Sequence, residues 1–344
     1  MNHEIYMQRC LELAALGRGK TSPNPMVGSV IVENGEIIGE GWHHRAGEPH
    51  AEVNAINSVK DRTRLTTATL YVNLEPCAHY GKTPPCALRI IEEKIPQVVI
   101  GTRDPHSAVA GKGIEMMRAK GIHVEEGILT DACSELNKAF FTFHKHKRPF
   151  ITLKFAKTND GFLAPENENR EAGEPAWITG EESKQRVHKL RAEVDAILVG
   201  GRTVAMDNPS LTTRLWPGKN PQRIIWTNRP IDAKSIVMSD GNPTWVIGLN
   251  AAQHGYSHPV EAWNASSIIE LVHSLFKRNI THLLVEGGKQ TLNQFISEDL
   301  WDEAFVLTGQ AEFKSGLKAP EINNAKLDSR EMVGGDTWQR FIRL

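Results

Sequence analysis

The chain has 344 residues, enough for two ordinary domains, and its 40% apolar and 24% charged residues are typical of a folded globular protein. Lysine and arginine number 40 against 41 aspartates and glutamates, so the formal net charge is −1, without the basic excess of a nucleic-acid-binding protein. No apolar run reaches the length of a membrane span, and the N-terminus lacks the pattern of a secretory signal.

The first half alternates helix and strand patterns, which indicates a parallel or mixed sheet covered by helices. Asn34-Gly35, between two apolar runs, predicts a hairpin over 28–42. Helices are predicted over 5–16, 50–59, 86–94, 113–121 and 134–147, and further strands over 68–76, 97–102 and 122–128.

A basic stretch at 144–149 ends at Pro149 and predicts a domain boundary, which gives domains 1–146 and 147–344. A solvated linker is favoured over a nucleic-acid patch, because no aromatic and basic stripe continues it. A second alternation follows, so both halves are expected to be α/β domains. Strands are predicted over 149–157, 195–201, 222–228, 244–249, 281–288, 303–309 and 338–344, and helices over 181–194, 266–278 and 291–300.

Cys77 and Cys86, each preceded by proline, could form a disulfide, part of a metal site or two core thiols. Four cysteines without an export signal indicate a reducing, cytoplasmic compartment, which disfavours the disulfide. His50, Cys77 and Cys86 are suitable zinc ligands, and three protein ligands leave a fourth position for water. Both cysteines are expected to open helical turns, whose N-termini favour thiolates. Cys10 and Cys133 lack such company and are expected to be buried apolar residues.

Glu52 follows His50 in the pattern H-x-E, and Cys77 follows a proline, as in zinc deaminases. In that chemistry the glutamate carries a proton from the zinc-bound water to the leaving amine without ligating the metal. Since residues two apart face different ways within a helix, the pair is expected at a helix start. A lone H-x-E would usually be coincidence, so the interpretation depends on the combination with the cysteines.

Several longer motifs together resemble the bifunctional deaminase/reductase of riboflavin biosynthesis over nearly the whole chain. The family also has the eight-residue gap between Cys77 and Cys86, where cytidine and tRNA-adenosine deaminases usually have two residues. The motifs are SPNPMVG (22–28), GEGWHHRAGEPHAEVNAI (39–56), LEPCAHYGKTPPC (74–86), DPHSAVAGKG (104–113), DGFLA (160–164), WIT (177–179), DAILVGGRTV (195–204), DNPSLTTR (207–214) and VEGG (285–288).

The resemblance implies a cytidine-deaminase-like domain followed by a dihydrofolate-reductase-like domain, with zinc and NADPH as cofactors. It implies zinc-hydroxide deamination of 2,5-diamino-6-(5-phosphoribosylamino)pyrimidin-4-one, followed by NADPH reduction of the ribosyl group. The product is 5-amino-6-(5-phosphoribitylamino)uracil. The implied partner is therefore a small phosphorylated pyrimidine, with neither nucleic acid nor membrane, and a homo-oligomer is expected.

The resemblance also implies roles for individual residues. His50, Cys77 and Cys86 would bind zinc, with Glu52 as the proton shuttle. Lys82 could reach a phosphate from the loop between the cysteines, although a solvated lysine would look the same. The implied deaminase pocket residues are Asn24, His43 and Lys82; the implied reductase substrate contacts are Lys154, Arg191, Leu211, Arg214 and Glu286; and the implied NADPH contacts are Ala156, Trp177, Thr203, Asp207, Gly287 and Gly288.

The second half of the sequence has no local motif that identifies a cofactor site. No G-x-G-x-x-G follows a strand, so nicotinamide binding depends on the resemblance; EGGKQT (286–291) could bind phosphate at a helix start or be a plain turn. Trp177 could equally be a core aromatic residue. The motifs depart from the family at Thr158-Asn159, in the extended acidic segment 165–175 and at its last residue Pro175, at 224–228 and at 308–316.

Two alternatives follow from these observations. The first is a deaminase whose second domain binds substrate or assembles subunits without reduction. The departures motivate it, but Asp207, Arg214 and Glu286 survive and favour a working reductase. The second is a nucleic-acid-editing deaminase, against which the near-neutral charge and the wide cysteine gap count.

Overall fold

The computed structural model describes residues 2–80, 84–105, 110–166, 173 and 176–344. Lys82, Pro175 and most of the acidic segment 165–175 lie outside the described residues. Among the helices of the described part, none is long and apolar enough to span a membrane. The chain divides into two compact units, Met1–Lys147 and Arg148–Leu344.

The first unit is built on a five-stranded mixed sheet in the order β2-β1-β3-β4-β5. β1 runs antiparallel to both of its neighbours, whereas β3, β4 and β5 are parallel. The strands are β1 (Gly28–Glu33), β2 (Glu36–Trp42), β3 (Thr69–Leu74), β4 (Gln97–Thr102) and β5 (His123–Glu126).

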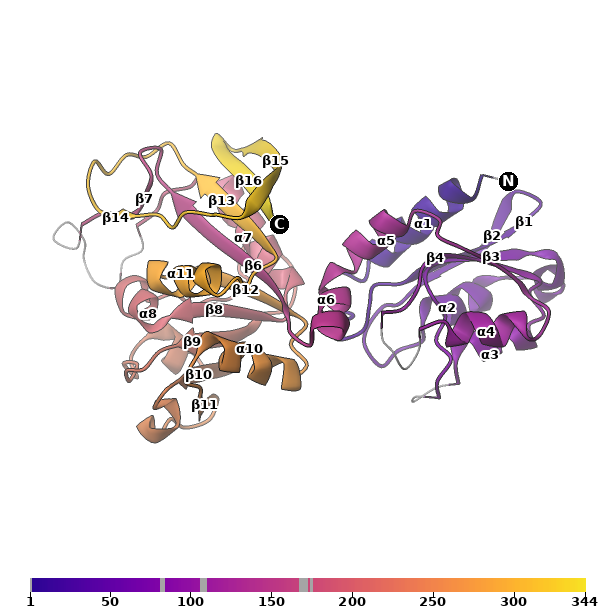
Figure 1. Cartoon of the computed structure of the whole chain (residues 1–344), viewed down its shortest axis with the longest axis horizontal. Helices are drawn as coiled ribbons and strands as arrows, with labels where there is room; N and C mark the ends of the chain where they lie inside the picture. The colour runs from indigo at the N-terminus through magenta and orange to yellow at the C-terminus, as the bar shows by residue number, and fades with distance from the viewer. Residues whose placement is uncertain (1, 81–83, 106–109, 167–172, 174–175) are drawn as a thin grey trace. The chain divides into compact units, whose positions relative to one another are not determined.

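Helices cover both faces of this sheet (Figure 1), as the sequence predicts. Alternate residues of one strand serve opposite faces, since Leu70 and Val72 pack on one side and Tyr71 on the other. The first side is covered by α2 (Ala51–Ser58), α3 (Cys86–Glu92) and α4 (Lys112–Arg118), and the second by α1 (His3–Ala15) and α5 (Thr130–Leu136); η1 (Arg62–Thr67) and α6 (Lys138–His146) complete the unit.

Two local predictions have different outcomes. The hairpin at Asn34-Gly35 is confirmed: both residues have positive φ, 51° and 84°, as a tight two-residue turn between strands requires. The single helix predicted over 134–147 is wrong, because Asn137, at φ −106°, separates α5 from α6. Its amide side chain bonds to the backbone of Met26 instead.

The second unit contains a nine-stranded sheet in the order β11-β10-β9-β8-β12-β6-β13-β16-β15. The strands from β11 to β13 in this order are parallel, and β16 and β15 add an antiparallel edge. These strands are β6 (Phe150–Lys157), β8 (Ala196–Gly200), β9 (Gln222–Trp226), β10 (Thr244–Gly248), β11 (Val260–Asn264), β12 (His282–Gly287), β13 (Glu303–Thr308), β15 (Ala325–Val333) and β16 (Asp336–Arg343).

Helices lie on both faces of this sheet (Figure 1), and buried side chains form a core on each face. Leu198 packs with α10 and α11, whereas its neighbours Ile197 and Val199 pack with α8 and α9. The helices are α7 (Glu181–Glu193), α8 (Gly201–Asp207), α9 (Ile236–Ser239), η3 (Ala251–His254), α10 (Ile268–Lys277) and α11 (Lys289–Ser297), and a small separate sheet pairs β7 (Phe162–Ala164) with β14 (Leu317–Lys318).

The sequence did not indicate strands β11 and β15. β15 is exposed along most of its length, so neither of its faces carries an apolar repeat. It forms through backbone pairing with β16, which hydrophobic periodicity cannot report.

Candidate active sites

Three side chains of the first unit form a cluster that can bind a metal ion. The nitrogen of His50 and the sulfurs of Cys77 and Cys86 all lie within 4.8 Å of one another. The Nδ1 atom of His50 is 3.3 Å from the Cys86 sulfur and 3.7 Å from the Cys77 sulfur. One imidazole and two thiolates at this spacing fit tetrahedral zinc and leave a fourth position for water.

The local structure explains how these ligands meet. His50 is the N-cap of α2 and Cys86 is the first residue of α3, so both lie at helix starts. The prediction that Cys77 also opens a helical turn is wrong, because the chain after β3 stays irregular there. The backbone N–H of Cys86 donates to the Cys77 sulfur at 3.3 Å. Hydrogen bonding by the Cys86 thiol lowers the pKa of Cys77 to about 4, with His50 adding to the effect, so Cys77 is a thiolate ready for a metal.

Glu52 lies beside this cluster, in the first turn of α2, as predicted. Its side chain is buried, and the burial raises the pKa of its carboxyl, while the charge of His50 opposes that rise. A hydrogen bond also joins it to Cys86. A buried carboxyl with a raised pKa can accept and return a proton near neutral pH, which is the requirement for a proton shuttle.

The predicted pocket residues Asn24 and His43 contact each other next to the zinc ligands. The Asn24 amide nitrogen lies 3.1 Å from Nε2 of His43, and Nδ1 of His43 lies 3.1 Å from the Pro49 carbonyl oxygen. These partners assign the proton of His43 to Nδ1, and burial lowers its pKa, so the ring is neutral. The ring packs edge-on against His50, with the ring centres 5.3 Å apart. His43 therefore supports the wall of the site.

Glu75 is a buried residue of this site that the sequence interpretation missed. Its carboxylate accepts hydrogen bonds from the backbone N–H groups of Asp104, Gly111 and Gly113 at 3.0–3.3 Å. These bonds join the segment before Cys77 to the start of α4. An acidic residue at the end of an apolar strand is the signal that could have identified it, since a buried carboxylate requires donors.

Two buried asparagines hold the segment that carries Asn24. Asn73 Oδ1 accepts from the N–H of Gly28, and its Nδ2 donates to the Met26 carbonyl. Asn137 binds both the N–H and the carbonyl of Met26, from 111 residues away in the sequence. Neither asparagine is part of a local motif, so the sequence alone did not reveal them.

The second unit contains a large cleft, with a volume of about 1730 Å³. Residues that follow β8, β9 and β12 line it, so it lies at the carboxyl edge of the parallel strands. From β8 the chain continues to β9 on one side, and from β12 it continues to β13 on the other side. The cleft thus occupies the switch point of the sheet, where open α/β sheets bind ligands.

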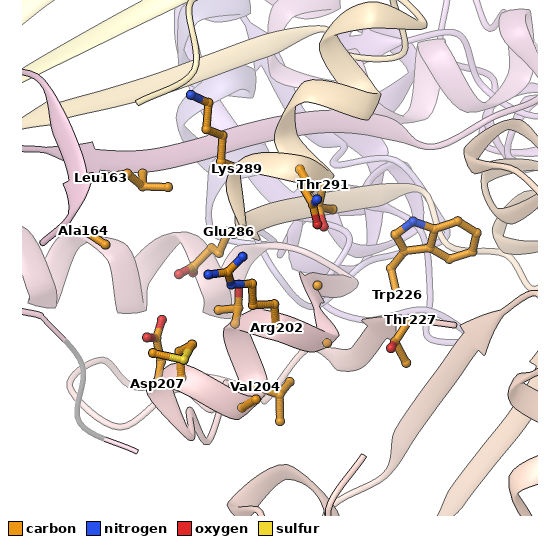
Figure 2. A pocket seen from close by; sticks show the side chains of 18 of the residues that line it. Leu163, Ala164, Arg202, Val204, Asp207, Trp226, Thr227, Glu286, Lys289 and Thr291 are labelled. Atoms are coloured by element: carbon orange, nitrogen blue, oxygen red, sulfur yellow. The ribbon is translucent and has the colours of Figure 1, made fainter. Parts of the chain in front are cut away.

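Figure 2 shows Trp226 and Thr227 at one end of the cleft and Asp207 at the other, with Glu286 and Arg202 between them. Glycines bring the backbone close to this space. A Cβ at Gly200 would lie 2.6 Å from the Thr291 hydroxyl, and Gly288 has φ +81° directly before α11. The two residues before α11, Gly287 and Gly288, line the cleft and have no side chains, an arrangement that lets an anion approach the helix start.

A buried ion network holds Glu286, which lines the cleft between its two ends. Arg191 donates to the Glu286 carboxylate through Nε at 2.7 Å and Nη2 at 2.8 Å, and Lys154 Nζ is 3.6 Å away. Burial alone would raise the pKa of Glu286, but Arg191 and Lys154 outweigh it and lower the pKa to about 2. Burial lowers the pKa of Lys154. The network thus keeps Glu286 charged and fixed.

The structure places the predicted reductase residues in two groups. The first group lines the cleft and consists of Lys154, Ala156, Thr203, Asp207, Glu286, Gly287 and Gly288. The second group lies outside its lining and consists of Trp177, Arg191, Leu211 and Arg214. Trp177 is 62% exposed, with the Lys184 ammonium 3.9 Å from its ring centre, although its neighbours Ala176 and Ile178 do line the cleft. Leu211 is buried in the core.

Two protein-family models match the chain, one in each unit. Residues 1–102 match the cytidine and deoxycytidylate deaminase zinc-binding region. Residues 149–309 match the RibD C-terminal domain. The first match covers the three ligands and Glu52, and the second covers most of the cleft, so the first unit has a zinc-binding deaminase site and the second is a reductase domain.

Full-length relatives and solved structures agree with these matches. The riboflavin biosynthesis protein RibD of Aquifex aeolicus is 39% identical, over 92% of this chain and 89% of the relative. RibD of Escherichia coli is 36% identical, over 89% of this chain and 87% of the relative. The crystal structure of a diaminohydroxyphosphoribosylaminopyrimidine deaminase/5-amino-6-(5-phosphoribosylamino)uracil reductase from Thermotoga maritima superimposes with a TM-score of 0.90, at 36% identity over 99% of both chains. The chain therefore belongs to the RibD family of bifunctional riboflavin-biosynthesis deaminase/reductases.

Proposed function

We propose that the chain catalyses two consecutive steps of riboflavin biosynthesis. Residues 1–146 deaminate 2,5-diamino-6-(5-phosphoribosylamino)pyrimidin-4-one, and residues 147–344 reduce the ribosyl group with NADPH to give 5-amino-6-(5-phosphoribitylamino)uracil. The relative from Thermotoga maritima carries the names of both activities and matches 99% of this chain. The observation that carries the proposal is the cluster of His50, Cys77 and Cys86 beside the buried carboxyl of Glu52.

In the deamination, the chain's own residues position the reactants and move the protons. His50, Cys77 and Cys86 would hold zinc, which would supply a water whose pKa is lowered to ~7. Glu52 accepts the proton of the attacking water and delivers it to the departing amine, so water adds at the ring carbon and ammonia leaves. We assign the contacts with the pyrimidine and its phosphate to Asn24, His43 and Lys82.

In the reduction, C1′ of the ribosyl group gains a hydride and the ring oxygen gains a proton. Two features of the cleft support the binding of a dinucleotide. It lies at the switch point of the sheet, and the start of α11 beside it is preceded by two glycines. We assign NADPH contacts to Ala156, Trp177, Thr203, Asp207, Gly287 and Gly288, and substrate contacts to Lys154, Arg191, Leu211, Arg214 and Glu286.

The test is incubation of the zinc-loaded protein with the diamino substrate and either NADPH or NADH. We expect stoichiometric ammonia release without any nicotinamide, and the ribitylamino product only when NADPH is added. The deaminated intermediate is then supplied directly with NADPH, and the nicotinamide absorbance is followed. Ammonia release without any NADPH oxidation would leave a deaminase alone, which is the first alternative.

Two further points need their own measurements. A nucleic-acid-editing enzyme would bind RNA with a steep dependence on salt, and we expect no such binding from a chain of net charge −1. The homo-oligomer stays a prediction, which light scattering coupled to size-exclusion chromatography checks.

A further inference from the structure

An irregular stretch over residues 210–214, called the turn below, follows the predicted cofactor residue Asp207, and side chains from elsewhere in the unit bind its backbone. Arg223, which is 1% exposed, donates through Nη1 to the carbonyl of Ser210 at 3.0 Å. Arg191 donates through Nη1 to the carbonyl of Thr212 at 3.2 Å, while its other nitrogens bind Glu286. The turn is thus tied directly to the network at the edge of the cleft.

His188 provides a third anchor for the turn. It lies in α7 one helical turn before Arg191 and is 5% exposed. Its Nδ1 accepts a hydrogen bond from the backbone N–H of Arg214 at 2.9 Å. Ala192 follows His188 by four residues on α7, so both lie on the same face of this helix. A Cβ at Gly218 would lie 2.6 Å from the Cβ of Ala192, so the chain after the turn packs tightly on this face. The three anchors hold every second residue of the turn.

The hydrogen bond requires His188 to be neutral, with its proton on Nε2. Burial, then the positive charges of Arg191, Arg214 and Lys154, lower the pKa of His188 to about 4, while Glu286 opposes the shift. The ring therefore remains an acceptor throughout the neutral range.

On the opposite side of the turn, three polar side chains converge. The hydroxyl groups of Ser210 and Thr212 lie 3.1 Å apart. Nη1 of Arg214 contacts both hydroxyls, at 3.1 Å from Thr212 Oγ1. A guanidinium beside two hydroxyl groups matches the donors that a phosphate monoester needs. The convergence depends on the backbone path of residues 210–214.

We propose that His188 is a positioning residue for the phosphate subsite of the reductase: by accepting the Arg214 N–H it fixes the turn that brings Ser210, Thr212 and Arg214 together around the substrate's phosphate. The inference rests on the proposed reduction of a phosphorylated ribosylamine. His188 does not touch the reacting atoms and acts through Arg214.

Three variants test the proposal. His188→Leu removes the acceptor and leaves the Arg214 N–H unpaired, whereas His188→Asn keeps an oxygen acceptor near the position of Nδ1. His273→Leu, which replaces an exposed histidine on α10, is the control. Each variant is assayed for NADPH oxidation with 5-amino-6-(5-phosphoribosylamino)uracil and with its dephosphorylated analogue. Binding of ribose 5-phosphate is measured separately by calorimetry, and thermal unfolding is recorded for all.

Losing the hydrogen bond to the buried His188 ring costs enough for an effect of about tenfold. We expect His188→Leu to raise the KM for the phosphorylated substrate about tenfold and to weaken ribose 5-phosphate binding by a similar factor. The KM for NADPH and the kinetics with the dephosphorylated analogue should stay within about twofold, and His188→Asn should recover most of the loss.

An equal loss with both substrates, or a wild-type KM in His188→Leu, would overturn the role of His188. The failure of the proposed function looks different: the wild-type protein would oxidise no NADPH with either substrate. In that case ribose 5-phosphate binding still decides the proposal, because it requires no reduction. Binding equal in the wild type and His188→Leu would reject it.

Discussion

The zinc cluster and the reductase cleft are built in different ways. The zinc ligands come from one short stretch, 50–86, and a metal ion dictates which atoms must meet and at what spacing. The residues that line the cleft are spread over the chain from 154 to 317 and come from many different segments. A metal site can therefore be recognised from a short sequence motif. The cleft is formed by the arrangement of the strands, so no short motif identifies it.

Metal removal should separate the two regions most sharply. Dialysis against a strong chelator should abolish ammonia release, because His50, Cys77 and Cys86 then have no ion to hold. NADPH oxidation with the deaminated intermediate should remain within about twofold, since the cleft contains none of these ligands. Both rates are measured on one sample, and added zinc should restore the first. Parallel loss of both rates would show that the regions depend on each other.

Glu52→Gln should keep zinc and lose deamination. The amide cannot shuttle a proton, so ammonia release should fall by about 1000-fold, within the range for general acid–base catalysis. Metal content by elemental analysis and reduction of the deaminated intermediate are the controls. Full activity of the variant would remove Glu52 from the mechanism.

Glu286→Gln should damage the second region while leaving deamination intact. The substitution strands the buried charges of Arg191 and Lys154, which costs about 3–5 kcal/mol of unfolding free energy. Because folding lowers the pKa of Glu286 to about 2, its contribution is present above the unfolded value of ~4.3 and is lost as the pH falls toward 2.

Urea unfolding of both proteins between pH 7 and pH 2 measures this effect. The difference in stability between wild type and Glu286→Gln should be constant near neutral pH and shrink below pH ~4. A difference independent of pH would mean that the carboxylate charge does not stabilise the network.

Trp177→Ala should have the smallest effect. We assign an NADPH contact to Trp177, but its ring is mostly exposed and lies under Lys184, so this contact should contribute little and its loss should change the KM for NADPH by less than about threefold. Steady-state kinetics at varied NADPH decide the point. A larger increase would show that the ring turns toward the cleft when the cofactor binds.

The sequence predicted the fold wherever apolar residues form a continuous buried run or recur at helical spacing. Strands such as β3 and β8 and helices such as α10 follow that rule and were correctly assigned. β15 was not predicted because it is exposed along most of its length and has no buried apolar face. The helix over 134–147 was misjudged because propensity cannot show that Asn137 has a distant backbone partner.

The same reason limits what could be predicted of the sites. His50, Glu52, Cys77 and Cys86 lie in short sequence motifs in which the residue types themselves indicate metal binding and proton transfer. Glu75 and His188 support these sites by binding backbone groups of other segments, and such partners are set by tertiary structure. The sequence therefore revealed the groups that perform chemistry better than the groups that hold them in place.

The bond from Asn137 to Met26 has a consequence for the order in which this protein is made. The segment that carries Asn24 is synthesised early, but two of its backbone hydrogen bonds must wait for a residue more than a hundred positions later. On a ribosome, the pyrimidine pocket can close only after nearly the whole first unit has emerged. A fragment ending at residue 102, where the deaminase family match stops, would contain all three zinc ligands. It would lack Asn137 and therefore both of its hydrogen bonds to Met26.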